Sequence, residues 1–440
     1  MGNDTMAGLA SFAVDSIPPG LVSQLGTKKE QDTPAPQPAR AASPTKSASS
    51  LNEASSDSGS LTGSKIFSPV SQVSAVTTRP QSPQNMGETK IDYEVESKPP
   101  ADFASLAAQA NTSRVAKAEP EVVLLTGVSG LLGHHLLKDL LEKPQIKKVI
   151  CVAVRQISER LSTKQLTQHA KVLYFEGDLR SERLGLFDED AAAIFDDIDV
   201  VIHNGADTSH LKYYPAIKGA NVNSTRWLTC MCLPRQIPIH YVSSVGVSLF
   251  LPGRTSFPPV SATDASPPAD GSHGYIASKW TNEKFLESVS ELYGLKVWIH
   301  RPSTIIREGA DTVGQVAQMD WVNALIAYSH RLKTVPKCKH ARGALDFVTV
   351  QTTVGDIVGH VLGERPRGPG NVAYAHQVAD LVLPLEDMKS LAGAGKAPYR
   401  EVAMEDWTAK AIAAGLHPAV AALIETMDAP ETYYPRMLKA

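Results

Sequence analysis

The sequence predicts an α/β fold with a doubly wound parallel sheet, and three observations lead to it. Buried-strand and helical patterns alternate along the chain between residues 121 and 300. The first strand pattern, residues 121–126, is followed at once by glycines at 127, 130 and 133 and then by leucines at helical spacing. Polar motifs stand directly after the strands, where parallel sheets bind ligands.

Six strands are expected in this region, and they are continuous apolar runs rather than alternating ones. Such runs are typical of strands that are buried on both faces of a parallel sheet. Helical patterns separate the strands, so right-handed crossover connections are expected. The clearest helical patterns are residues 191–195, 216–232 and 275–293. The expected strands are residues 121–126, 148–154, 171–175, 199–203, 238–243 and 295–300.

From residue 301 to residue 440 the alternation is less regular. We expect a smaller, mostly helical lobe here, which binds substrate and carrier and closes over the ligand edge of the sheet. Its helical patterns are residues 316–328, 354–362, 385–392 and 404–427, and its strand-like pieces are residues 346–350 and 371–374.

The first 118 residues have a different composition. Residues 23–118 are rich in Ser and Pro and cannot bury a core, so a disordered linker is expected there. A weak helical pattern at residues 102–113 predicts a helix that packs on the domain beginning at residue 119. Residues 1–22 resemble the last helix of an acyl or peptidyl carrier domain, and a frayed amphipathic terminus is the alternative.

Charge and cysteine content exclude several classes of protein. The 440 residues carry a net charge of -3 with a pI near 6.5, which gives no electrostatic footprint for nucleic acid or an acidic membrane. The four cysteines are too few and too scattered for a disulfide framework, and no metal site is expected. No apolar run is long enough to cross a membrane, so we expect a cytoplasmic protein.

The glycine-rich turn after the first strand predicts a phosphate-binding unit. Gly127 would permit the tight turn, Gly130 would let backbone amides approach a pyrophosphate, and Gly133 would let the helix lie close to the strand. The N-terminus of that helix would face the anion. A glycine pattern of this kind also occurs in ordinary strand-to-helix turns, so its weight depends on the motifs that follow it.

Residues after the next strands predict a Rossmann-type dinucleotide site for NADPH within residues 119–300. Arg155 ends the second strand and suits a 2′-phosphate, whereas an acidic residue there would favour NAD. A solvated arginine is the alternative. Asp178 is expected beside the adenine. The predicted cofactor-binding residues are Thr126, Gly127, Ser129, Gly130, Leu131, Leu132, Gly133, Arg155, Asp178, Leu179, Asn204, Gly205, Ala206, Tyr275, Lys279 and Pro302.

Two further motifs predict general acid chemistry at the same edge of the sheet. Tyr275 and Lys279 are four residues apart at the start of a helix, so the ammonium is expected to lower the pKa of the phenol. A chance surface pair is the alternative. Ser244 follows the fifth strand and is expected to hold a substrate carbonyl oxygen, while its neighbour Ser243 bonds the backbone. The predicted catalytic residues are Ser244, Tyr275 and Lys279.

These motifs resemble the extended short-chain dehydrogenase/reductase superfamily. Its signature of Thr-Gly-x-x-Gly-x-x-Gly, a strand serine and Tyr-x-x-x-Lys is met in this order. A narrower resemblance, to the terminal thioester reductase domain of fungal polyketide synthase-nonribosomal peptide synthetase hybrids, covers roughly residues 120–437. The stretches that carry it are residues 203–211, 221–225, 240–244, 274–280 and 298–303.

The resemblance implies an NADPH-dependent enzyme that acts on an acyl or aminoacyl thioester held on a carrier protein's phosphopantetheine arm. It gives Lys279 a bond to the nicotinamide ribose, and it implies the C-terminal piece of a megasynthase or a free-standing relative. Neither nucleic acid nor a membrane is an expected partner. Two positions depart from the family pattern: His134 replaces Arg or Lys, and residues 307–309 replace a small residue and glycine. Both departures bear on NADPH binding.

Reductive release of the thioester to an aldehyde is the leading functional hypothesis. Three alternatives stay open at this point. Redox-independent Dieckmann cyclisation would release a tetramic acid from the same oxyanion site. A sugar-nucleotide epimerase or dehydratase fits Tyr275 and Lys279 but not Arg155. A cofactor-binding protein without catalysis is the third.

Overall fold

The computed structural model describes residues 90–109, 116–117, 119–155, 168–251, 253–306, 320–363, 371–378, 381–392, 397–430 and 432–439. The prediction for residues 1–22, most of the predicted linker and the departure at residues 307–309 lie outside these described residues.

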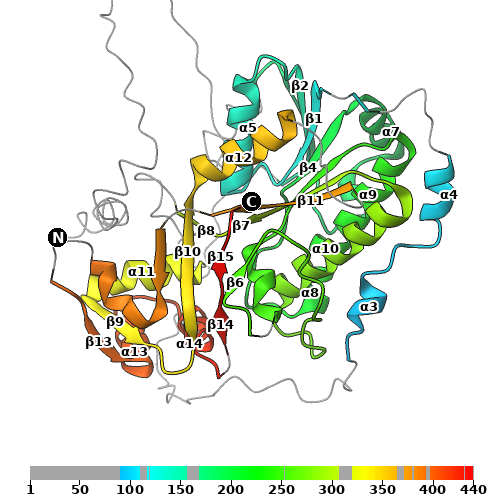
Figure 1. Ribbon diagram of the computed structural model, residues 1–440. Helices are drawn as coiled ribbons and strands as arrows, with labels where there is room; N and C mark the ends of the chain where they lie inside the picture. The colour runs from blue at the N-terminus through cyan, green and yellow to red at the C-terminus, as the bar shows by residue number, and fades with distance from the viewer. Residues whose placement is uncertain are drawn as a thin grey trace, which may run out of the picture. The chain divides into compact units, whose positions relative to one another are not determined.

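A parallel sheet forms the centre of the described part of the chain (Figure 1). It has seven strands there in the order β11-β7-β5-β4-β1-β2-β3, and every neighbouring pair is parallel. The six strands expected from the sequence are present, and the doubly wound α/β fold is confirmed. The strands are β1 (Val122–Thr126), β2 (Lys148–Val154), β3 (Val172–Glu176), β4 (Val200–His203), β5 (Ile239–Val242), β7 (Val297–Pro302) and β11 (Val372–Gln377).

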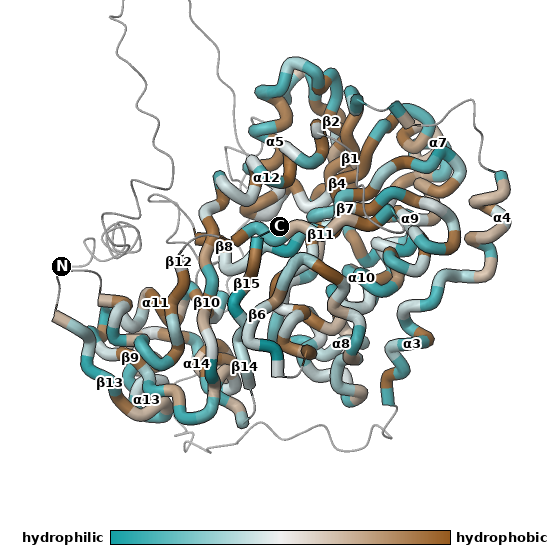
Figure 2. The backbone as a smooth tube through the Cα atoms, viewed as in Figure 1, coloured by the Kyte–Doolittle hydropathy of each residue, from teal (hydrophilic) through white to brown (hydrophobic). Residues whose placement is uncertain are grey.

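Both faces of this sheet are covered by helices, which explains the continuous apolar runs. In β1, Val123 and Leu125 pack in one core cluster, and Leu124 packs in the cluster on the opposite face. Successive strand side chains point to opposite faces, so a strand covered on both sides needs an unbroken apolar run. Figure 2 shows hydrophobic colouring along β1, β2 and β4. The covering helices are α5 (Leu131–Glu142) and α12 (Val350–Leu362) on one face and α7 (Asp188–Asp197), α9 (Ser224–Cys232) and α10 (Gly274–Tyr293) on the other.

The chain beyond residue 300 contributes to this sheet as well as to a separate lobe. The strand-like piece 371–374 was expected in the smaller lobe, and that assignment is wrong because it belongs to β11, which pairs with β7. The helix expected at residues 354–362 is part of α12, and it packs against α5. An apolar pattern indicates that a segment is buried, but it does not indicate which partner buries it.

The lobe has a core of its own, around Leu325, Met388 and Trp407. Its central strand is β10 (Arg342–Thr349), which pairs with β8, β12 and β14. The lobe was expected to be mostly helical, and the structure adds this small sheet. The other elements are β8 (Thr304–Ile306), α11 (Trp321–Leu332), β9 (Thr334–Lys337), β12 (Leu381–Pro384), η8 (Leu385–Ala392), β13 (Arg400–Ala403), α13 (Met404–Ala413), α14 (Pro418–Thr426) and β14 (Tyr433–Tyr434).

Two short helices precede the main sheet and differ from the predicted linker. In α3 (Tyr93–Glu96), Tyr93 is buried and makes edge contacts with the rings of Tyr214 and Trp280. In α4 (Phe103–Ala108), which lies within the expected helix 102–113, Phe103 is buried against Phe285. The prediction of a disordered linker is therefore wrong for α3, while the helix predicted at residues 102–113 is present in part as α4. Aromatic contacts of Tyr93 and Phe103 hold these two helices.

The last described residues connect the lobe to the domain of the main sheet. Within the lobe, β14 pairs with β10, and two residues later β15 (Arg436–Met437) pairs with β6 (Ser256–Phe257), beside the main sheet. Both pairings are parallel, and Met437 N also donates to a carboxylate oxygen of Asp346 at 3.2 Å. None of the helices in the described ranges is long and apolar enough to cross a membrane.

Candidate active site

The turn between β1 and α5 has the geometry of a dinucleotide cradle. Gly127 has a φ of +75°, and a β-carbon there would lie 2.6 Å from Cα of Gly205. A β-carbon at Gly133 would lie 2.0 Å from the carbonyl oxygen of Gly127. Gly130 precedes the first turn of α5, whose unpaired backbone amides face the loop. The two outer glycines are therefore required sterically, and the helix end is available to an anion.

Thr126 lies behind this cradle rather than on its surface. The residue is fully buried; its Oγ1 accepts a hydrogen bond from Gly205 N at 2.8 Å and bonds Nδ1 of His203 at 2.8 Å. Thr225 donates its hydroxyl proton to a carbonyl oxygen and meets Nε2 of His203 at 3.0 Å, so Nε2 carries the imidazole proton. Burial lowers the pKa of His203 to about 3, which keeps the ring neutral. This chain of bonds fixes the end of β4 against the end of β1.

Arg155 and Asp178 were expected on different parts of the cofactor, and the structure pairs them with each other. Nε of Arg155 lies 3.1 Å from a carboxylate oxygen of Asp178, whose other oxygen accepts from Arg180 N at 2.8 Å. The Arg155 side chain is half exposed at the rim of the cavity described below. The carboxylate therefore orients the guanidinium at the end of β2.

The structure distinguishes the two serines that follow β5. Ser244 is half-buried and caps the 3-10 helix η5 (Val245–Phe250), where its Oγ accepts from Gly246 N at 3.0 Å. Ser243 is buried, and its hydroxyl donates to the carboxylate of Glu283. The partner of the Ser243 hydroxyl is thus a side chain and not the expected backbone. Both serines line the cavity, but the hydroxyl proton of Ser243 is already given to Glu283.

Tyr275 and Lys279 lie in the first turns of α10, but their electrostatics differ from the expectation. Nζ of Lys279 donates to the carbonyl oxygen of Val242 at 2.6 Å and stands 5.8 Å from the centroid of the Tyr275 ring. Burial, helped by the Asp320 carboxylate, raises the pKa of Tyr275 to about 12, so the predicted lowering is wrong. Burial lowers the pKa of Lys279 to about 7 against the attraction of Glu283. Desolvation outweighs a cation that does not touch the phenol oxygen.

Sequence reasoning missed three residues around Tyr275. Asn221 lies in a single π-turn (Gly219–Asn223), where its amide donates to Ser278 Oγ at 2.9 Å and its Oδ1 accepts from Asp207 N at 2.7 Å. The ring of His210 meets the Tyr275 ring edge-on at 4.9 Å. No clear sequence signal marks Asn221, because other polar residues, Asn223, Ser224 and Thr225, stand close to it in the same helical stretch. The third residue is Asp320, whose carboxylate helps to raise the pKa of Tyr275, and no sequence signal links these two positions.

One cavity of 1310 Å³ joins these features. From the predicted set it is lined by Gly127, Ser129, Gly130, Leu131, Leu132, Arg155, Leu179, Asn204, Gly205, Ala206, Ser244, Tyr275, Lys279 and Pro302. Thr126, Gly133 and Asp178 support this lining without being part of it. The cavity continues into the lobe, where its walls are largely apolar: Trp321, Ala324, Ala327, Tyr328, Leu345, Val420, Leu423 and Met427.

A dinucleotide cradle, a serine and a Tyr-Lys pair along one edge of a parallel sheet define an NAD(P)-binding oxidoreductase. The chain belongs to the NAD-binding family described as Male sterility protein, which matches residues 125–357.

Its relatives are fungal synthases much longer than this chain. It is 44% identical to the highly reducing polyketide synthase calA of Penicillium decumbens, over 100% of this chain and 15% of that protein. It is 39% identical to the polyketide synthase-nonribosomal peptide synthetase phmA of Phaeosphaeria nodorum, over 72% of this chain and 8% of the relative. The chain thus spans a small part of the relatives it matches.

A solved structure has the same fold. The terminal R domain from the myxalamid PKS-NRPS biosynthetic pathway superposes with a TM-score of 0.61 at 23% identity, covering 79% of this chain and 88% of that one. The predicted resemblance to terminal reductase domains is confirmed at the level of family and fold.

Proposed function

We propose that this chain releases an acyl chain from a carrier protein by reducing its phosphopantetheine thioester to an aldehyde. The observation that supports this most directly is the single cavity, which joins the glycine cradle, the Ser244, Tyr275 and Lys279 side chains and an apolar chamber in the lobe. Such a reduction needs a site for the phosphates of the cofactor, a proton donor and a cavity that accommodates the acyl chain.

The residues of the cradle fit a dinucleotide. A side chain at Gly127 or Gly133 would collide with backbone, so glycine at both positions lets the turn and the start of α5 pack closely. NADPH is the form we propose, because Arg155 presents a cation where a 2′-phosphate would lie. When bound, NADPH supplies hydride to the thioester carbon.

Ser244 and Tyr275 act on the carbonyl oxygen of the thioester. The Oγ of Ser244 already accepts from Gly246 N, so its hydroxyl proton is directed to another acceptor. A phenol whose pKa is about 12 holds its proton at neutral pH and delivers it to the more basic oxyanion. Collapse of the resulting hemithioacetal breaks the carbon–sulfur bond and gives an aldehyde and the free thiol of the carrier.

The apolar chamber supports an aliphatic acyl chain as the group that is released. Side chains of α11 and α14 surround it, among them Trp321 and Leu423, together with Met427 just after α14. Burying such a chain contributes about 0.8 kcal/mol for each methylene removed from water. Relatives that are highly reducing polyketide synthases support the same class of substrate.

The test is turnover of an acyl-pantetheine thioester with and without NADPH, followed by mass spectrometry. We expect an aldehyde only with NADPH, and Tyr275→Phe to lower kcat by about a hundredfold or more because the oxyanion loses its proton donor. Undiminished turnover by Tyr275→Phe would refute the assignment. A tetramic acid formed without NADPH from an aminoacyl substrate would identify a Dieckmann cyclase instead.

A further inference from the structure

A fully buried ion pair lies directly behind the candidate catalytic residues. Glu283 on α10 and Arg301 on β7 have no exposed side-chain surface. Nε and Nη2 of Arg301 donate to the two carboxylate oxygens of Glu283 at 3.0 and 2.7 Å. This fork-to-fork geometry is the strongest that an arginine and a carboxylate form, and it fixes the orientation of both groups.

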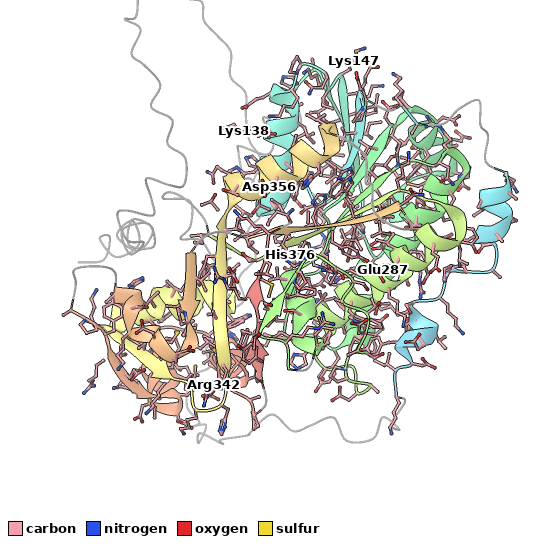
Figure 3. The ribbon with its side chains drawn as sticks, viewed as in Figure 1. Lys138, Lys147, Glu287, Arg342, Asp356 and His376 are labelled. Carbon is pink, nitrogen blue, oxygen red and sulfur yellow. The ribbon has the colours of Figure 1, made fainter. Side chains whose placement is uncertain are left out.

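The third nitrogen and the flat faces of the Arg301 guanidinium also have partners. Nη1 donates to the carbonyl oxygen of Val260 at 2.6 Å and lies 3.3 Å from Nε2 of His376, which Figure 3 labels. The guanidinium carbon lies 4.9 Å and 4.8 Å from the ring centroids of Phe257 and Tyr374. Arg301 is therefore held from several elements, and it holds Glu283 in turn.

Glu283 has two contacts with the candidate active site. Its carboxylate accepts the hydroxyl proton of Ser243, the residue before Ser244. On α10 it lies one turn after Lys279, at the i+4 position, where side chains share a helix face. The same carboxylate thus faces the serine turn and the lysine.

We propose that Glu283 is a positioning residue for the reduction: through Ser243 it fixes the turn that presents Ser244, and from one turn along α10 its carboxylate acts on Lys279. The kinetic consequences of this inference rest on the proposed function. The effect of the Glu283 charge on the pKa of Lys279 can be measured without turnover.

The anion that acts on Lys279 is Glu283, which is itself paired with the Arg301 guanidinium. Tyr241 on β5 and Tyr275 on α10 are neutral phenols, with the ammonium 4.7 and 5.8 Å from their ring centroids. His203 on β4 is neutral at physiological pH. Burial brings the pKa of Lys279 to about 7, and Glu283 opposes that fall. Loss of the carboxylate charge of Glu283 therefore lowers the pKa of Lys279 further, so Lys279 gives up its proton at a lower pH.

The test compares the full-length chain with Glu283→Gln, Glu283→Asp and Ser243→Ala. A matched control is Glu287→Gln, since Glu287 lies one turn further along α10 and bonds Ser261, Thr263 and Tyr374 (Figure 3). Lys279 is titrated without cofactor by NMR of chains labelled with 13C at lysine Cε, with Lys279→Met to assign the signal. Kinetic constants for NADPH and an acyl-pantetheine thioester are measured across pH.

We expect Glu283→Gln to lower the midpoint of Lys279 and to reduce kcat about fivefold at neutral pH, with little change in the KM for NADPH. A fall of one unit from a pKa of about 7 would leave roughly one tenth of Lys279 protonated instead of about one half. Ser243→Ala and Glu283→Asp should lower kcat while Lys279 keeps its midpoint, and Glu287→Gln should change neither. If Glu283→Gln does not fold, the Asp and Ser243 variants still decide the positioning part.

The inference would be overturned if Lys279 in a folded Glu283→Gln chain titrated as it does in the wild type. It would also be overturned if Ser243→Ala and Glu283→Asp kept the wild-type kcat. Absence of turnover in every chain, wild type included, would refute the proposed function instead. The NMR titration would then decide the role of Glu283 alone.

Discussion

Replacing Gly133 by alanine tests whether the cradle depends on close contact between α5 and the β1 turn. The new β-carbon would lie 2.0 Å from the carbonyl oxygen of Gly127 and 2.9 Å from Nδ2 of Asn204. Ordinary contacts begin near 3.4 Å, so α5 would have to withdraw from the turn by about 1.4 Å. Overpacking of this kind costs about 1–3 kcal/mol. The closer neighbour, the Gly127 carbonyl, is backbone and cannot move away cheaply, whereas Nδ2 of Asn204 is a side-chain end.

The same displacement moves the backbone amides at the start of α5. Because a loss of about 1.4 kcal/mol in binding weakens affinity tenfold, we expect the Kd for NADPH to rise at least about tenfold. Fluorescence titration of NADPH measures this, and thermal unfolding by circular dichroism should show a lower Tm for Gly133→Ala.

The control is Gly359→Ala on α12, where an added β-carbon meets no atom within 4 Å. It should bind NADPH like the wild type and unfold at the same or a slightly higher temperature, since alanine favours a helix over glycine by about 1 kcal/mol. A folded Gly133→Ala chain with wild-type affinity for NADPH would refute the steric argument.

Three further predictions concern the cofactor, the lobe and the N-terminal helices. Arg155→Ala should raise the KM for NADPH about tenfold and leave that for NADH unchanged, because only the 2′-phosphate meets the guanidinium; equal effects on both would contradict the predicted role. Burial raises the pKa of Asp346 to about 6, so its neutral form is favoured in the folded state and its contribution to stability is lost as pH rises through about 6. Asp346→Asn should therefore stabilise the chain above that pH by roughly 1–2 kcal/mol after screening, and should have no such effect at pH values below the unfolded pKa, as urea unfolding at both pH values will test. Phe103→Ala should cost about 3–5 kcal/mol in urea unfolding because its ring is buried against Phe285, and a cost near zero would show that α4 is not part of the cooperative fold.

The sequence was sufficient for six strands of the sheet and for the residues that follow them. Six strands were readable from their apolar runs, and five of them are buried, as Val123, Leu124 and Leu125 illustrate. The sixth, the edge strand β3, was expected to be buried and is largely exposed. Parallel strands carry their ligands at one edge, so the glycine turn, Ser244 and Tyr275 were expected together from their order alone. They line one cavity in the structure.

Two features needed the tertiary structure. The segment at β11 reads as a strand, but only its pairing with β7 assigns it to the main sheet. The phenol of Tyr275 has a raised pKa because desolvation, which depends on everything packed around it, exceeds the effect of Lys279. The sequence by itself therefore determined which segments are buried and which side chains share an edge, since both follow from local periodicity. Tertiary packing decided what each buried group faces, including the approach of Asp320 to Tyr275 and the pairing of Arg301 with Glu283, because those partners meet only when distant segments fold together.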